Sequence, residues 1–149
     1  MKIPLAELIK YPLPAFLNGR CEPKVYYKWL LVKAITLLRR DKKRKKPYTA
    51  NATISTYKEK IHSAVTESCE YDPYTGEYLA WELIGQWDSS HDQSDDYKKE
   101  FALLPTVDHV NATELKFQIC SWKINDAKSS LTTEEFLNLC EMVTNYRKK

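Results

Sequence analysis

The chain has 149 residues, with 23 Lys and Arg against 20 Asp and Glu, a net charge of +3, 43% hydrophobic residues and only 3 glycines. The apolar fraction, which includes 10 Tyr and 4 Trp, is enough to build a core, so the composition excludes a disordered chain. Neither the P-loop pattern nor the dinucleotide-binding fingerprint occurs, and nucleotide hydrolysis of that kind is therefore excluded.

Compartment and redox state follow from what the sequence lacks. No apolar run approaches the roughly 20 residues that cross a bilayer, and the first residues contain no signal-peptide apolar core. We therefore expect an intracellular, cytoplasmic protein without a membrane partner. The four cysteines stand far apart, without a C-x-x-C pair, so reduced thiols are expected and no structural zinc. These cysteines are Cys21, Cys69, Cys120 and Cys140.

The N-terminal region, residues 1–68, is predicted to be helical. Apolar residues recur at helical spacing over 23–40 and again from Ile54 to near Ser68. Between these helices, seven of the eight residues from 39 to 46 are basic: Arg39, Arg40, Lys42, Lys43, Arg44, Lys45 and Lys46. Like charges at this density are solvated unless a polyanion covers them, so the segment is either an exposed linker or a phosphate-binding patch.

The following region, residues 69–149, contains turns, strands and short helices. A turn is predicted over 72–76, where Pro and Gly occur together, and an exposed polar loop over 87–99. An extended segment over 104–110 and an alternating segment over 115–120 predict two strands of a hairpin. A short helix is expected over 121–129.

The last predicted helix carries a capping box, in which Thr132 precedes Glu135 by three residues. We expect four residues to form its buried stripe: Phe136, Leu139, Cys140 and Val143.

The hairpin and the short helix bring together the residue types needed for phosphodiester hydrolysis. Asp108 and Asn125 supply carboxylate and amide oxygens, which suit Mg²⁺ or Mn²⁺. His109 can take a proton from water beside such an ion. An Asp-His pair alone is more often a surface turn, and the combination with Asn125 and Lys128 is what favours a site.

These residues resemble the HNH, or ββα-metal, endonucleases, whose core has Asp-His on the first strand and Asn-x-x-Lys on the helix. The resemblance covers about residues 69–145. It implies that Asp108 and Asn125 are metal ligands and His109 is the general base. It also implies that Lys128 is either structural or faces phosphate. We expect Lys128, together with the basic segment, to contact backbone phosphates.

Two further patterns bear on the resemblance. Many members hold zinc with two cysteine pairs, whereas this chain has Asp72, Thr75, Ser121 and Ile124 at the corresponding positions. Loss of all four zinc cysteines together is expected if a hydrophobic core replaces the metal ion in stabilising the fold. The family's middle Asn, which orients the catalytic His, has no match in the second strand. Asn111 is the nearest candidate.

We therefore predict an α+β protein with an N-terminal helical region, residues 1–68, and an HNH-like ββα-metal module with a C-terminal helix, residues 69–149. The predicted function is metal-dependent cleavage of DNA. One metal centre usually cuts one strand, so a homodimer that cuts both strands is possible, but the sequence does not decide it. Two alternatives stay open. One is an inactive HNH-fold protein for DNA binding or assembly, and the other is an interaction protein in which the basic segment is only a linker.

Overall fold

The structure is a computed structural model that describes residues 1–86 and 95–149. The N-terminal region is helical, as predicted. It contains α1 (Leu5–Lys10), α2 (Pro23–Lys43) and α3 (Ile54–Glu67), with short 3-10 turns at Ala15–Leu17 and Pro47–Thr49. A third 3-10 turn, at Trp81–Leu83, follows in the C-terminal region.

Helix α2 begins at Pro23, in the first turn where proline is tolerated. It ends at Lys43 and so contains five of the eight residues of the basic segment. The helix continues into this segment because Asp41 belongs to its buried side: Asp41 lies four residues after buried Leu37 and is itself 1% exposed. Asp41 therefore continues the buried face of α2, and the segment is not simply a solvated linker.

The predicted hairpin is confirmed. Strand β1 (Pro105–His109) pairs with β2 (Phe117–Ser121) in an antiparallel, two-stranded sheet. Asp108 lies opposite Gln118, and His109 lies opposite Phe117. Because successive side chains in a strand point to opposite faces, this register directs Asp108 and His109 into different surroundings.

Among the residues described from 95 onward, the chain also forms the helices α4 (Asp95–Glu100), α5 (Trp122–Lys128) and α6 (Thr133–Arg147). Part of the predicted loop, from residue 95 onward, is therefore wrong, because α4 forms there with acids in its first turn and lysines in its last, as the helix dipole favours. The rest of that loop prediction lies outside the described residues. The capping box of α6 is confirmed, since Thr132 and Glu135 bond reciprocally.

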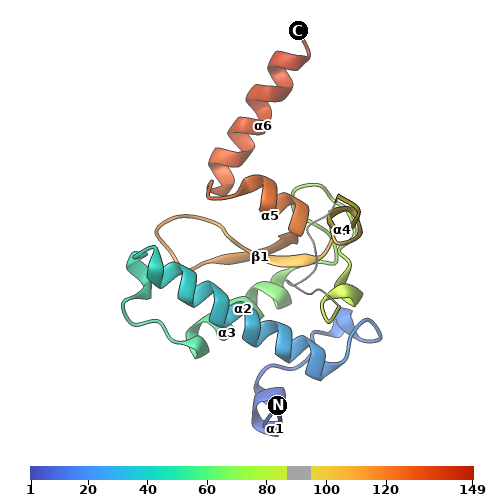
Figure 1. Ribbon diagram of the computed structural model, residues 1–149, viewed down its shortest axis with the longest axis vertical. Coiled ribbons are helices and arrows are strands. Elements are labelled where there is room, and N and C mark those ends of the chain that lie inside the picture. Colours follow the sequence, from blue (N-terminus) through green and yellow to red (C-terminus); the bar gives the residue numbers. More distant parts are fainter. Residues whose placement is uncertain (87–94) are drawn as a thin grey trace.

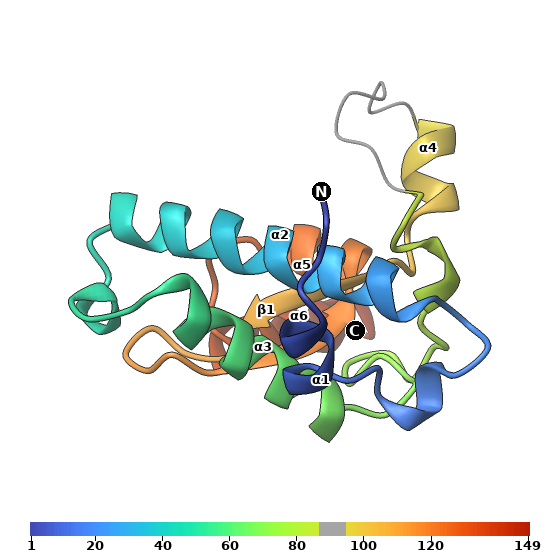
Figure 2. The same cartoon turned by 90° about the horizontal axis from the view of Figure 1, so that it is seen from below.

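The hairpin lies between two helical layers (Figure 1). Helices α2 and α3 cover one side, and α5 covers the other. Figure 2 shows α2 running along the hairpin beside α3. One hydrophobic core joins both predicted regions, because Tyr26, Leu30 and Tyr57 pack in the same cluster as Val107 and Phe117. No helix in residues 1–86 or 95–149 has the length and apolar character needed to cross a membrane.

The predicted buried stripe of α6 is wrong. Only Phe136 is buried, and every residue from 137 to 149 is exposed. The physical reason is visible in Figure 1, where α6 leaves the body of the protein after its first turn.

Candidate functional site

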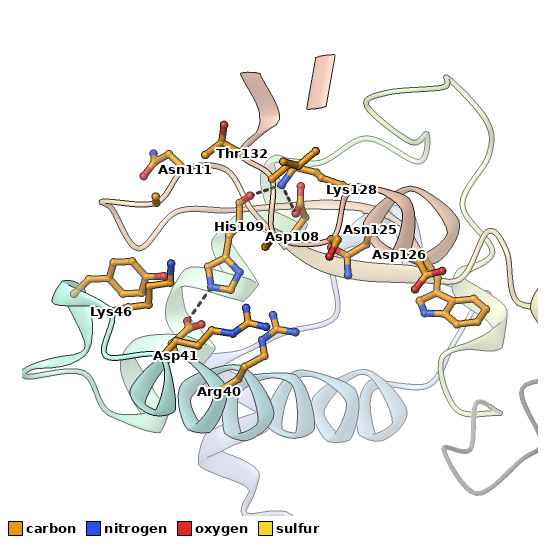
Figure 3. Close-up of a pocket in the computed structure, with 17 residues that line it drawn as sticks. Arg40, Asp41, Lys46, Asp108, His109, Asn111, Asn125, Asp126, Lys128 and Thr132 are labelled. Atoms are coloured by element: carbon orange, nitrogen blue, oxygen red, sulfur yellow. Dashed lines mark hydrogen bonds and ion pairs between the residues drawn. The ribbon is translucent and has the colours of Figure 1, made fainter. Parts of the chain in front are cut away.

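A pocket of about 270 Å³ opens where the end of α2 faces β1 and α5. Figure 3 shows His109 near its centre, with Asp41 and Arg40 on the α2 side and Asp108, Asn125 and Lys128 on the opposite side. All the predicted ligands and the predicted base therefore border one pocket. Its lining also includes Arg44, Lys46, Tyr48, Asn111, Ala112, Trp122, Asp126, Ser129, Ser130, Leu131 and Thr132.

His109 is fixed by contacts on several sides. Its Nε2 lies 2.8 Å from Oδ2 of Asp41, a residue of α2. Its ring lies edge-on to the Phe117 ring, with the ring centroids 5.1 Å apart, and stacks on the Tyr48 ring, with the centroids 6.4 Å apart. The imidazole is thus held in one orientation, while 20% of the side chain stays exposed. Figure 3 shows its other ring nitrogen on the pocket side.

The carboxylate of Asp41 determines the tautomer of His109. Burial is the largest single influence and raises the pKa of Asp41, but the hydrogen bonds from His109 and Tyr57, together with the nearby charges of His109 and Arg40, bring the pKa below its ordinary value. Asp41 is therefore ionised at neutral pH and can only accept hydrogen bonds. Hence Nε2 carries the proton, and a neutral His109 has its lone pair on Nδ1.

Asp41 is itself held by the neighbouring helix. The Tyr57 hydroxyl, from α3, donates to Asp41 Oδ2 at 2.7 Å. Proximity to this carboxylate and burial both raise the pKa of Tyr57, with burial the larger cause. The other oxygen, Asp41 Oδ1, is buried without a hydrogen-bond partner among the described residues. Such an unsatisfied oxygen costs stability, and groups of this kind are concentrated at functional sites.

Asp108 lies on the other face of β1 and is engaged in a buried ion pair. Lys128 Nζ donates to Asp108 Oδ1 at 2.9 Å and to the backbone oxygen of His109 at 3.0 Å. Asp108 Oδ2 accepts from Tyr74 and Gln118, each at 3.1 Å. Both side chains of the ion pair are almost fully buried, at 2% and 3% exposure.

The prediction that Lys128 contacts phosphates is therefore wrong, since the residue is 1% exposed and its ammonium is paired with the Asp108 carboxylate inside the protein. It instead connects α5 to β1 through Asp108 and the carbonyl group of His109.

Asn111 does not orient His109 in this structure. Its Oδ1 accepts hydrogen bonds from the backbone N–H groups of Thr113 and Glu114, at 3.0 and 2.8 Å. This is an Asx turn, which shapes the connection of the hairpin. Two other residues hold His109 in place of Asn111. Asp41 contacts the His109 ring, and Lys128 donates to the His109 backbone oxygen.

Asn125 borders the same pocket as Asp108, and Figure 3 shows it between Asp108 and Arg40. The two residues offer hard oxygen donors, which fit Mg²⁺ or Mn²⁺. A carboxylate has about four acceptor positions, and Asp108 uses three of them. One remains beside the Lys128 ammonium, so a divalent ion would compete with that charge.

Within the described residues, no three of His, Cys, Asp and Glu cluster in a way that could hold a metal ion.

The basic segment is divided by its geometry. Arg40 and Arg44, one helical turn apart, and Lys46 line the pocket, and none of the three forms an ion pair within residues 1–86 and 95–149. The other predicted phosphate contacts are exposed but lie outside the pocket lining: Arg39, Lys42, Lys43 and Lys45. Three cations of the basic segment thus line the same pocket as His109.

The positions that correspond to the family's zinc cysteines are joined by hydrogen bonds. Asp72 Oδ2 accepts from the backbone N–H of Ser121 at 2.6 Å, and its Oδ1 accepts from the N–H groups of Tyr74 and Thr75. The Ser121 hydroxyl caps α5 by accepting from Ile124 N. A buried carboxylate, and not apolar packing alone, therefore connects the turn at 72–76 to the sheet.

Sequence reasoning missed Asp41, Tyr57, Tyr74 and Gln118. Asp41 was detectable, because it continues the helical spacing of buried α2 residues. Gln118 and Tyr74 gave no such signal, since their roles depend on the register of the hairpin and on the fold of the turn.

Comparisons with protein-family models, curated proteins and solved structures found no match. A functional assignment therefore depends on the geometry and chemistry of the pocket itself.

Proposed function

We propose that the protein is an endonuclease that hydrolyses phosphodiester bonds of DNA, with His109 as the general base. The observation that carries the proposal is the arrangement of His109, which is held at Nε2 by ionised Asp41 beside Arg40, Arg44 and Lys46. A base with a defined tautomer next to unpaired cations suits attack of water on a phosphate group.

Each group of residues in the pocket has a separate role in the proposed reaction. Nδ1 of His109 takes a proton from the attacking water, a contribution of about 10²–10⁴ in rate for a general base. Asp41 then stabilises the imidazolium ion that forms, because the two groups already share a hydrogen bond. Arg40, Arg44 and Lys46 bind backbone phosphates, and Arg can do so with two parallel hydrogen bonds.

A divalent ion, Mg²⁺ or Mn²⁺, is part of the proposal. Asp108 and Asn125 would hold it, and it would supply positive charge to stabilise the phosphate and the departing oxygen. Because Lys128 already neutralises Asp108, we expect weak metal binding, so that activity keeps rising with metal concentration and is not saturated by trace amounts of the ion.

A second candidate function is DNA binding without cleavage. It is favoured by the Asp108–Lys128 ion pair, which leaves the predicted metal ligand less available. The basic side of the pocket would be the same in both cases, so binding alone does not distinguish them.

Conversion of supercoiled plasmid to nicked circles, measured with Mg²⁺, with Mn²⁺ and with chelator, tests the choice. The endonuclease predicts nicking that requires either ion and stops with chelator. Salt-sensitive DNA binding without nicking at any metal concentration would support the second candidate. Negligible DNA affinity at low salt would contradict both.

A further inference from the structure

Helix α6 carries an exposed apolar stripe, formed by Leu139, Met142, Val143 and Tyr146. Their exposed fractions are 47%, 69%, 55% and 73%. The spacing of three, one and three residues places all four on one side of the helix. Because Figure 1 shows α6 projecting from the body of the protein, this α6 stripe lies away from the layers that form the core.

A helix in this position needs a partner for stability. Isolated helices of about 12–15 residues are marginal in water, and their stability in proteins comes mainly from packing of an apolar face. Of the 15 residues of α6, only Phe136 is buried. The capping box at Thr132 fixes the start of α6 but covers none of the α6 stripe.

The charges at the ends of α6 indicate what the partner is. Acidic Glu134 and Glu135 occupy the first turn, while basic Arg147 is in the last turn and is followed by Lys148 and Lys149. Two copies of α6 side by side in opposite directions bring acidic ends to basic ends and align their dipoles favourably. Two copies in the same direction bring like charges together.

We propose that the α6 stripe is the interface of a homodimer, in which it packs antiparallel on the α6 stripe of a second copy. Specific interfaces bury about 1,200–2,000 Å² in total, and a single pair of short helices lies at the low end of that range. The dimer is therefore reversible and depends on concentration. This inference does not depend on the proposed nuclease activity.

The dimer would also organise the two pockets. Leu131 and Thr132, which directly precede α6, line the pocket. In an antiparallel pair the two pockets lie toward opposite ends of the joined helices, whose 15 residues span about 22 Å at ~1.5 Å per residue.

Sedimentation velocity of the full chain over a range of protein concentrations tests the proposal. We expect wild-type protein to pass from monomer to dimer, and the variant Leu139→Glu/Val143→Glu to remain a monomer under the same conditions. A matched control, Leu137→Glu/Thr144→Glu, adds the same charge at exposed positions on the opposite face of α6 and should still dimerise. Circular dichroism and thermal melting establish that both variants are folded.

Salt tests the direction of packing. At 0.1 M salt the screening length is about 10 Å, and charges farther apart than this interact little. Raising the salt concentration to this level should therefore increase the dissociation constant of an antiparallel dimer, whose end charges attract. It should decrease the dissociation constant of a parallel dimer, whose end charges repel. Wild-type protein that is monomeric at every concentration, or a control pair that abolishes the dimer as fully as the stripe variant, would overturn the homodimer. Strengthening by salt would overturn the antiparallel arrangement.

Discussion

At the scale of single residues, the contact between Asp41 and His109 gives the site its chemistry. An ionised carboxylate at Nε2 leaves the Nδ1 lone pair for a proton. Tyr57 holds the carboxylate from the next helix, so three elements, α2, α3 and β1, determine one imidazole orientation.

Replacing Asp41 by Asn tests this arrangement. The amide can donate to Nε2 and so place the proton on Nδ1, where the base is needed. We expect the cleavage rate to fall by about 10²–10⁴, as for other bases held in the wrong tautomer, while DNA affinity changes little. Single-turnover nicking and a binding titration measure the two quantities.

The variant Tyr57→Phe is the matched control. It removes one hydrogen bond to Asp41, at a cost of about 1 kcal/mol or more in unfolding free energy, but keeps the carboxylate against His109. Its cleavage rate should stay close to that of wild type. Equal reductions of activity in Asp41→Asn and Tyr57→Phe would indicate that Asp41 acts only through stability.

The sequence predicted which residues border the pocket better than what each one contacts. The Asp-His pair and the helical Asn-x-x-Lys spacing brought Asp108, His109, Asn125 and Lys128 to one place. The burial of Lys128 was not predictable, because it depends on Asp108 pointing toward α5. Asp41 was hidden by its basic neighbours, which made the segment look uniformly solvated.

At the scale of elements, hydrogen bonds to Asp72 hold the 72–76 turn on the sheet. Burial raises the pKa of Asp72, but backbone hydrogen bonds from Ser121, Thr75 and Tyr74 lower it by more, and the net shift is downward from 3.8. A carboxyl group with a lowered folded pKa stabilises the fold above its unfolded pKa and loses that effect as pH falls through the folded value.

Asp72→Asn should therefore destabilise the protein in a pH-dependent way. Its amide places a donor beside the Ser121 N–H, which costs about 1–3 kcal/mol of unfolding free energy near neutral pH. The difference from wild type should shrink below about pH 4, where Asp72 begins to bind a proton in the unfolded chain, and should be lost as pH falls through the lower pKa of the folded state. Urea denaturation at several pH values measures it, and a difference that stays constant into the acid range would contradict the account.

Elements with local signals were predicted well, and their packing was not. An extended segment predicted β1, alternation of apolar and polar residues predicted β2, and the Thr132–Glu135 capping box predicted the start of α6. Helical spacing of apolar residues in α6 wrongly predicted burial of Leu139 and Val143. An amphipathic pattern shows that a helix has an apolar face, but not which other part of the protein, or which partner, covers that face.

At the scale of the whole molecule, a small net charge of +3 conceals a concentrated positive side. Arg40, Arg44 and Lys46 line the pocket, while the acids next to them, Asp41 and Asp108, are paired internally. Asp126 is the third acid of the pocket lining and is exposed, so the local field there is positive because three cations outnumber one exposed acid. A field of this kind attracts phosphates even when the total charge is low.

The double variant Arg40→Ala/Arg44→Ala should weaken DNA binding and reduce the slope of log affinity against log salt by about 0.9 for each phosphate that the protein no longer neutralises. Lys24→Ala/Lys28→Ala is the matched control, because it removes two exposed cations with the same spacing from the other end of α2. Equal effects of the two pairs would show that only total charge matters. Fluorescence anisotropy at several salt concentrations makes the comparison.

The most direct measurement of the central claim is the single-turnover rate of plasmid nicking by His109→Ala, with DNA affinity and thermal stability measured on the same preparation. The account predicts that nicking falls by at least the roughly 10²-fold of a general base, while affinity and folding are nearly unchanged. A His109→Ala protein that nicks DNA as fast as wild type would contradict it.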